Sequence, residues 1–465
     1  MPFQFGTVNE AVNRLAIGVH VILTAILLLP GLTCAQGETN PGRLSAEQDL
    51  PGHWEGELSH LEQTYPVRMD ITRNDAVWEI TIDVPEYLIY GAGTRVNESA
   101  GWWTITSELL PDTEIRVQLK NGQLVGQCTG FCGVTSEVVL DRDSSRPVRY
   151  RYTNIEFTNG DGRLKGTLVQ PDGEGPFPAI VWTHGSGQDT RSTFYYTGRA
   201  HLMAQHGIAS LIYDKRGAGE STGSRFWDLD VLVDDALAAV VAIKSRADVD
   251  SSAIGIAGFS QGGWIAPATA ARENDIDFVI VGATPGVSGG DQNIFSMANR
   301  MRRDGESDET IAAAEQFVTR LYEFYATGEN RDAMSTALEK ASSADWYDNK
   351  WVSNVLFIPE DGLPNGPNPI WEPFARDPMD SWRHVQVPVL SMWGGDDIDV
   401  PAELSRDRIS RVLEEIGNSN VTLKIFEGAS HGMWQAENSG RWDWPRQAEG
   451  AHQLMVAWVL EQTRR

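Results

Sequence analysis

Three short segments of the sequence carry residue types that together can perform nucleophilic catalysis. Ser260 lies in Gly258-Phe259-Ser260-Gln261-Gly262-Gly263, between an apolar run and a run of small residues. This G-x-S-x-G pattern is typical of a nucleophile elbow, a tight turn from a strand into a helix that exposes the serine hydroxyl at the helix N-terminus. A serine hydroxyl needs a base to take its proton, and that base needs an acid to orient it.

Candidates for the base and the acid follow the serine in the chain. His431 stands between small residues just past a predicted strand, and Asp396, Asp397 and Asp399 follow another predicted strand. The spacing G-x-x-D-x-x-V-P favours Asp397 as the acid, with Asp396 and Asp399 as close rivals. Asp399 could instead help to start the helix expected after this loop. We therefore predict Ser260, Asp397 and His431 as the catalytic residues.

A glycine-rich segment upstream of the serine could stabilise the negative charge that such a reaction creates. A predicted strand ends in His184-Gly185-Ser186-Gly187. A loop at this place can present a backbone N–H opposite the N–H of the residue that follows the nucleophile. We predict the amides of Gln261 and Ser186 as the oxyanion donors, with Gly185 as the alternative to Ser186. The ring of His184 is expected to brace the loop.

Five motifs in this order resemble the α/β-hydrolase superfamily: H-G-S-G, D-x-R-G-x-G-x-S, G-x-S-x-G-G, G-x-x-D-x-x-V-P and G-x-S-H-G. More narrowly, they are similar to secreted serine esterases related to dienelactone hydrolases and prolyl oligopeptidases. The resemblance covers roughly residues 150–465. It implies an α/β-hydrolase fold and a serine hydrolase that needs neither a metal nor an organic cofactor.

The elements that must hold these residues alternate between strand and helix. Across residues 148–465 this alternation predicts a catalytic domain with a doubly wound, mostly parallel α/β sheet, whose strand ends carry the site. From about 286 to 380 the alternation stops, and apolar residues recur at three- and four-residue steps instead. We predict that this insertion forms a helical cap over the carboxyl edge of the sheet.

Residues 45–143 predict a separate, small all-β domain. Apolar and polar residues alternate in 79–84 and again in 115–120, and Asn121-Gly122 is typical of a hairpin turn. No catalytic grouping occurs in this part, so we expect it to pack or to gate the substrate. Cys128 and Cys132 are predicted to form a small disulfide loop, with two free buried thiols as the alternative.

Residues 1–35 predict a secretory signal peptide. Arg14 precedes an apolar run, which ends at Pro30-Gly31 and is followed by small residues before a cut after Ala35. Retention of this run as a membrane anchor and lipidation of Cys34 stay open as alternatives. We expect an exported protein, periplasmic or extracellular, with no stable membrane insertion after cleavage.

Composition narrows the range of partners. The formal net charge of −26 argues against nucleic acid and anionic membrane surfaces. We expect a small-molecule carboxylic ester as substrate, cleaved through an acyl-enzyme. A serine peptidase of the prolyl-oligopeptidase type is the alternative enzyme, although about a hundred N-terminal residues are too few for a β-propeller. A binding protein with a vestigial triad is the alternative outside enzymes. The sequence predicts neither the acyl and alcohol preference nor the oligomeric state.

Overall fold

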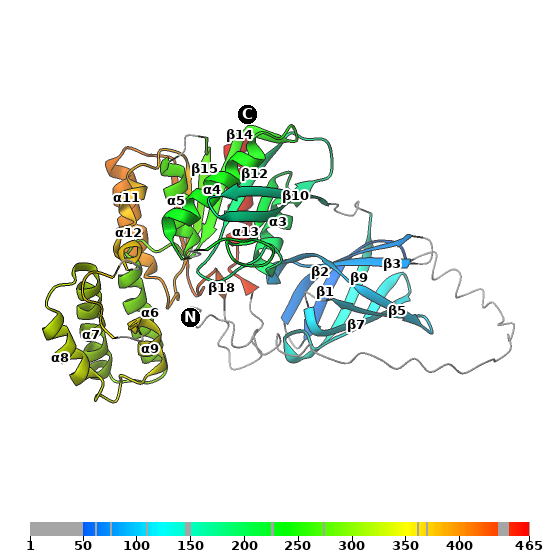
Figure 1. Cartoon of the computed structure of the whole chain (residues 1–465). Helices are drawn as coiled ribbons and strands as arrows, with labels where there is room; N and C mark the ends of the chain where they lie inside the picture. Colours follow the sequence, from blue (N-terminus) through cyan, green and yellow to red (C-terminus); the bar gives the residue numbers. More distant parts are fainter. Residues whose placement is uncertain are drawn as a thin grey trace, which may run out of the picture. The chain divides into compact units, whose positions relative to one another are not determined.

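The computed structural model describes residues 50–60, 63–74, 77–107, 110–144, 150–224, 227–272, 275–359, 362–368, 371–435 and 446–464. The chain divides into two compact units, one within residues 4–148 and one from residue 149 onwards. Figure 1 shows the N-terminal unit in blue and cyan. The predicted signal peptide, residues 1–35, lies outside the described residues. Among the described helices, none combines the length and the apolar character that a membrane span requires.

The N-terminal unit is one antiparallel sheet of nine strands in the order β4-β3-β2-β1-β9-β8-β7-β6-β5. The edge strand β5 also contacts β3, so the sheet curls towards a barrel. Alternate residues point into the curl, where Trp54 and Trp103 are buried. The strands are β1 (Gly52–His60), β2 (Gln63–Asn74), β3 (Val77–Val84), β4 (Ile89–Gly93), β5 (Arg95–Ser99), β6 (Trp102–Ser107), β7 (Leu110–Lys120), β8 (Gln123–Thr129) and β9 (Thr135–Asp143).

Two sequence predictions fall in this sheet and have different outcomes. The predicted hairpin turn is confirmed, because Asn121 and Gly122 both have positive φ and join β7 to β8. The predicted disulfide is not borne out, because Cys128 is a free thiol. Cys128 lies on the inward face of β8, where burial raises the pKa of its thiol to about 12. The side chain of Cys132 lies outside the described part of the chain.

The second unit contains an eight-stranded sheet in the order β10-β11-β13-β12-β14-β15-β16-β17. The strands from β13 to β17 are parallel, and the hairpin β10–β11 adds antiparallel strands at one edge. The predicted mostly parallel α/β-hydrolase sheet is therefore confirmed. The strands are β10 (Tyr150–Asn159), β11 (Gly162–Pro171), β12 (Phe177–Thr183), β13 (Ala209–Tyr213), β14 (Val249–Phe259), β15 (Phe278–Gly282), β16 (Val389–Gly394) and β17 (Val421–Phe426).

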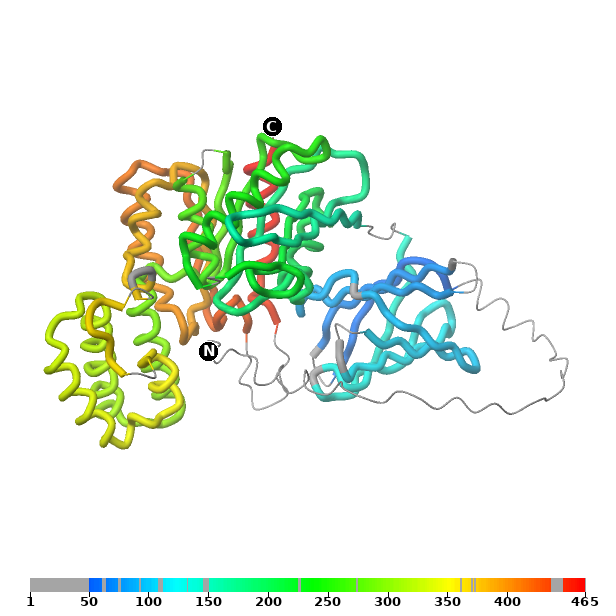
Figure 2. The backbone as a smooth tube through the Cα atoms, in the orientation of Figure 1, coloured from blue at the N-terminus to red at the C-terminus, as the bar shows by residue number. Residues whose placement is uncertain are grey.

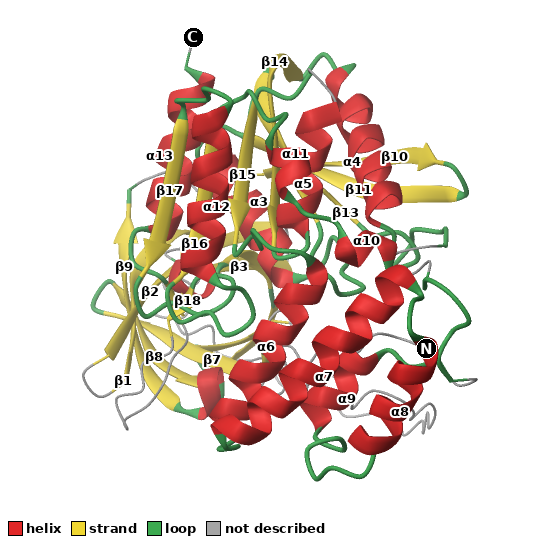
Figure 3. Ribbon diagram, turned by 90° about the vertical axis from the view of Figure 1, so that its left-hand side faces the viewer, coloured by secondary structure: helices red, strands yellow, loops and turns green. Residues whose placement is uncertain are grey.

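Helices that connect these strands or follow the last of them cover the sheet (Figure 3). All residues of β13, β15 and β16 are buried, as expected for parallel strands that are shielded on both faces. This burial explains why they are continuous apolar runs rather than alternating ones. The helices are α3 (Phe194–Gln205), α4 (Leu229–Lys244), α5 (Gly262–Arg272), α12 (Ala402–Glu415) and α13 (Ala451–Thr463).

Between β15 and β16 the chain leaves the sheet and forms a helical insertion, drawn in olive to orange in Figure 2. Its longest helix begins where Ser307 accepts a hydrogen bond from the N–H of Thr310. Phe317 and Leu321 on its inner face belong to an apolar cluster that the insertion builds for itself. The helices are α6 (Gly289–Arg303), α7 (Asp308–Thr327), α8 (Arg331–Ala341), α9 (Lys350–Leu356), α10 (Glu372–Ala375) and α11 (Met379–Trp382).

Candidate active site

Ser260 occupies the strained turn that its motif predicts. It lies between β14 and α5 with a φ of 56°, in the left-handed region that a serine rarely adopts. The flanking glycines are sterically required. A Cβ atom on Gly258 would lie 2.2 Å from the carbonyl oxygen of Gly262, and one on Gly263 would lie 2.3 Å from Oγ1 of Thr284. The turn therefore holds the Ser260 hydroxyl at the N-terminus of α5.

The structure brings two of the predicted residues into direct contact. Nδ1 of His431 donates a hydrogen bond of 2.8 Å to Oδ2 of Asp397. The other carboxylate oxygen accepts the N–H groups of Asp399 and Val400, at 2.8 and 3.0 Å. With Nδ1 engaged, Nε2 is the nitrogen left to act as a base. No hydrogen bond joins Ser260 to His431 among the described residues.

The three aspartates of this loop have three different environments. The Asp397 side chain is fully buried, whereas Asp396 is exposed. Asp399 accepts hydrogen bonds of 2.6 Å from both Ser296 and Arg300 of α6. The predicted role of Asp399 at a helix start is wrong, because α12 begins after Pro401 without any side-chain cap. Instead, Asp399 ties the helical insertion to the loop that carries Asp397.

These carboxylates act on the protonation of His431. Burial alone would lower the pKa of the imidazole, but the charge and hydrogen bond of Asp397 and the charge of Asp399 outweigh burial. The pKa of His431 is consequently raised above its ordinary value of 6.5. Arg300 acts in the opposite direction, since its positive charge lowers this pKa. The site thus favours an imidazolium at this position.

The ring of His184 supports the segment after β12, as the sequence predicted. Nε2 of His184 donates a 2.6 Å hydrogen bond to the carbonyl of Tyr213, and burial lowers the pKa of His184 to about 4, so the ring stays neutral. The N–H of Gly185 donates to the Tyr196 hydroxyl at 3.0 Å. Within the described part of the chain, the N–H groups of Ser186 and Gln261 donate no hydrogen bond. These two amides, rather than that of Gly185, are left to face an oxyanion.

One buried cation beside this segment was not among the residues that the sequence predicted for the site. The ammonium of Lys215, just past β13, donates to the carbonyl oxygen of Gly185 at 2.7 Å and to Oε1 of Gln261 at 2.8 Å. The neighbouring Arg216 points elsewhere, because its Nε donates a hydrogen bond of 2.9 Å to the carboxylate of Asp235. Lys215 occupies the first x of the motif D-x-R-G-x-G-x-S, a position at which the motif specifies no residue type. No pattern in the sequence alone connects Lys215 to Gln261.

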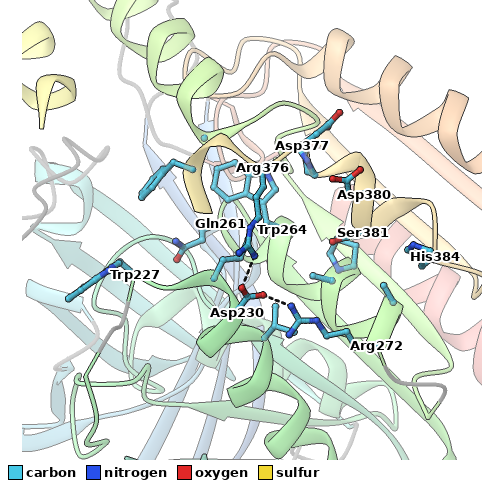
Figure 4. A pocket seen from close by; sticks show the side chains of 18 residues that line it. Trp227, Asp230, Gln261, Trp264, Arg272, Arg376, Asp377, Asp380, Ser381 and His384 are labelled. Carbon is cyan, nitrogen blue, oxygen red and sulfur yellow. Dashed lines mark hydrogen bonds and ion pairs between the residues drawn. The ribbon is translucent and has the colours of Figure 1, made fainter. Parts of the chain in front are cut away.

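A pocket of about 290 Å³ lies between α4 and α5 on one side and the segment of α10 and α11 on the other. Figure 4 shows Trp227, Gln261 and Trp264 in its wall, with Asp230 between Arg272 and Arg376. Its wall combines aromatic and other apolar side chains with several charged ones, and Ser260, Asp397 and His431 are not among the residues that line it. Because Gln261 follows Ser260 directly, the pocket reaches the residue next to the predicted nucleophile.

Comparison with known proteins gives both relatives and solved structures. Esterase EstD of Thermotoga maritima is 26% identical over 280 residues, which are 59% of this chain and 59% of that protein. The quorum-quenching protein AidA of Acinetobacter baumannii is 31% identical over 129 residues, which are 27% of this chain and 42% of that protein. The chain thus spans less than two thirds of the length of either relative.

A solved esterase of Pyrococcus furiosus is 16% identical, with a TM-score of 0.40, over 61% of this chain and 84% of that one. The sequence profile of the alpha/beta hydrolase family matches residues 180–441, which include Ser260, Asp397 and His431. This match extends over more than half of the sequence. The chain therefore belongs to the alpha/beta hydrolase family.

Proposed function

We propose that this protein is a serine hydrolase that cleaves carboxylic esters. The observation that carries the proposal is the buried Asp397 carboxylate, which holds the His431 imidazole through Nδ1. Ser260 in its strained turn completes the set of nucleophile, base and acid. The esterase among the relatives supports the choice of an ester as substrate.

In the proposed reaction, Oγ of Ser260 attacks the ester carbonyl carbon while Nε2 of His431 accepts the hydroxyl proton. Asp397 stabilises the resulting imidazolium, and the amides of Ser186 and Gln261 hydrogen bond to the carbonyl oxygen as it becomes negative. The C–O bond to the alcohol then breaks, and the leaving alkoxide takes the proton from His431. Water attacks the acyl-enzyme by the same route, releases the acid and restores Ser260.

The proposed substrate is a small molecule that places one end in the pocket beside Gln261. A pocket of about 290 Å³ fits an acyl or alcohol group of modest size rather than a folded protein. The three aromatic residues Trp227, Trp264 and Phe374 in its wall favour an apolar group.

A panel of activated substrates tests this proposal. Purified protein is assayed on nitrophenyl acetate, butyrate and octanoate, on a matching thioester, and on a proline nitroanilide. We expect ester cleavage that is lost in Ser260→Ala. Faster cleavage of the anilide would favour the peptidase alternative. Tight binding without turnover of any substrate would favour a binding protein.

We also propose that residues 1–35 direct export. The test is expression of the full chain in a bacterial host, followed by fractionation and mass measurement of the protein. A mature chain in the periplasm or medium that begins at Gln36 is the expected result. A full-length chain that stays with the membrane fraction would contradict cleavage and support an anchor.

A further inference from the structure

We propose that Lys215 is the positioning residue of the oxyanion hole and supplies a fixed positive charge behind both donor amides. This inference rests on the proposed ester hydrolysis and adds a residue to its machinery. Lys215 lies just past β13, and its side chain is only 1% exposed. It is therefore held in one environment rather than moving in solvent.

The geometry of one peptide group explains how Lys215 can orient a donor. The carbonyl of Gly185 and the N–H of Ser186 belong to the same planar peptide, and in a trans peptide they point in opposite directions. The ammonium of Lys215 binds this carbonyl oxygen at 2.7 Å. The Ser186 N–H must then point away from Lys215. A hydrogen bond to the carbonyl also polarises the peptide, which strengthens its N–H as a donor.

The same ammonium holds the second donor segment. Its hydrogen bond of 2.8 Å to Oε1 of Gln261 fixes the side chain of the residue whose N–H is the other predicted donor. The backbone of Lys215 is itself anchored, because its N–H donates to the carbonyl of Asp189 at 3.0 Å. A single cation thus binds both the loop after β12 and the turn after β14.

The charge of Lys215 is not neutralised by a direct ion pair among the described residues, since both of its acceptors are neutral oxygens. The charge of Asp189 acts on Lys215, and the Asp189 carboxylate accepts hydrogen bonds from Tyr195 and Tyr196. His184 is the other titratable group that faces it, and this ring stays neutral. Burial lowers the pKa of Lys215 to about 8, with Asp189 opposing this effect. An oxyanion nearby would therefore be stabilised by a cation that deprotonates in mildly alkaline solution.

The test compares wild type, Lys215→Met and Lys215→Arg on one nitrophenyl ester between pH 6 and 10. For Lys215→Met we expect kcat to fall about 10- to 100-fold with KM within about twofold, less than the loss on removing a direct oxyanion donor. The ratio of wild-type kcat to the kcat of either variant should fall above about pH 8, where Lys215 loses its proton, because the titration of His431 is common to all three enzymes. Lys215→Arg should keep more activity than Lys215→Met because its charge does not titrate.

Lys244→Met is the matched control, since it removes the same charge from a partly exposed lysine that pairs with Asp275 on the surface. Thermal unfolding of each variant separates misfolding from a catalytic effect. If Lys215→Met does not fold, the comparison with Lys215→Arg still decides, because a ratio of wild-type kcat to Lys215→Arg kcat that does not fall above about pH 8 would overturn the proposal. A folded Lys215→Met with wild-type kcat at every pH would also overturn it. These results are independent of the proposed function, which fails instead if Ser260→Ala retains activity.

Discussion

The two sides of the proposed active site carry opposite charges. On the acid–base side, the loop after β16 brings the carboxylates of Asp397 and Asp399 close to His431. On the oxyanion side, Lys215 directs an ammonium towards the segments that carry the predicted donor amides. In the proposed reaction a positive imidazolium develops on the first side and a negative oxygen on the second. Each side therefore already holds the charge that stabilises its half of the transition state.

The two sides differ in how their fixed charges are compensated. Asp399 is paired with Arg300 of the helical insertion, so the acid–base side keeps the negative charge of Asp397 and depends on the insertion. Lys215 is bound by neutral oxygens within the core of the unit. Substitutions on the first side should therefore shift the titration of His431, whereas substitutions on the second should change the stabilisation of the oxyanion.

The largest loss of activity is expected when the proposed nucleophile, Ser260, is removed. Ser260→Ala should lower kcat by about 10⁵-fold or more while the protein stays folded, as for nucleophile removal in other triads. The measurement is the rate of ester hydrolysis, repeated after a second purification that removes any contaminating active enzyme. Substantial activity in a well-folded variant would show that another residue attacks the ester.

The next largest loss of kcat is expected when the charge of Asp397 is removed from the acid–base side. Asp397→Asn should lower kcat by about 10³- to 10⁴-fold, because an amide no longer fixes the imidazole tautomer or stabilises the imidazolium. Kinetics on one ester at one pH check this expectation. If Asp399→Asn loses more activity than Asp397→Asn, the acid has been assigned two residues too early.

A smaller effect concerns the pH dependence of kcat, which the titration of His431 sets. The base must be neutral, and its pKa is raised, so wild-type kcat should rise with pH along a limb centred above pH 6.5. Arg300→Met removes a positive charge that lowers this pKa, and should move the limb to higher pH by up to about one unit. Asp399→Asn should move the limb to lower pH. Shifts of the same sign in both variants would contradict this electrostatic account.

The smallest effect is expected at the exposed aspartate of the same loop. Asp396→Asn should leave kcat within about twofold of wild type, because surface substitutions away from a site have little effect. It also serves as the control for the two variants above, since it makes the same chemical change in the same loop. A loss comparable to that of Asp397→Asn would mean that the loop rearranges when substrate binds.

The sequence predicted the parts of the site that are local in the chain. The turn at Ser260 depends on the small residues on either side of it, and the buried parallel strands are read from continuous apolar runs. What the sequence could not predict are contacts between distant segments. Arg300 and Asp399 are 99 residues apart, and Lys215 and Gln261 are 46 residues apart. Such pairs depend on how the loops pack, which no spacing rule encodes.

The predicted disulfide shows the reverse case, in which local spacing misled. Two cysteines four positions apart are compatible with a small loop, but Cys128 lies on the inward face of β8 and remains a thiol. The direction of a side chain on a strand is set by the register of the sheet. That register was not available from the spacing of the two cysteines.

Covalent labelling tests the central claim most directly. A nitrophenyl phosphonate ester reacts with an activated serine and leaves a stable adduct, whose position is read by peptide mass mapping. We predict one adduct per chain, on Ser260, formed at a rate that rises with pH along the same limb as ester hydrolysis. Loss of ester hydrolysis should follow the extent of labelling. An adduct on any other residue, or equal labelling of Ser260→Ala, would contradict the proposal that Ser260 is the nucleophile.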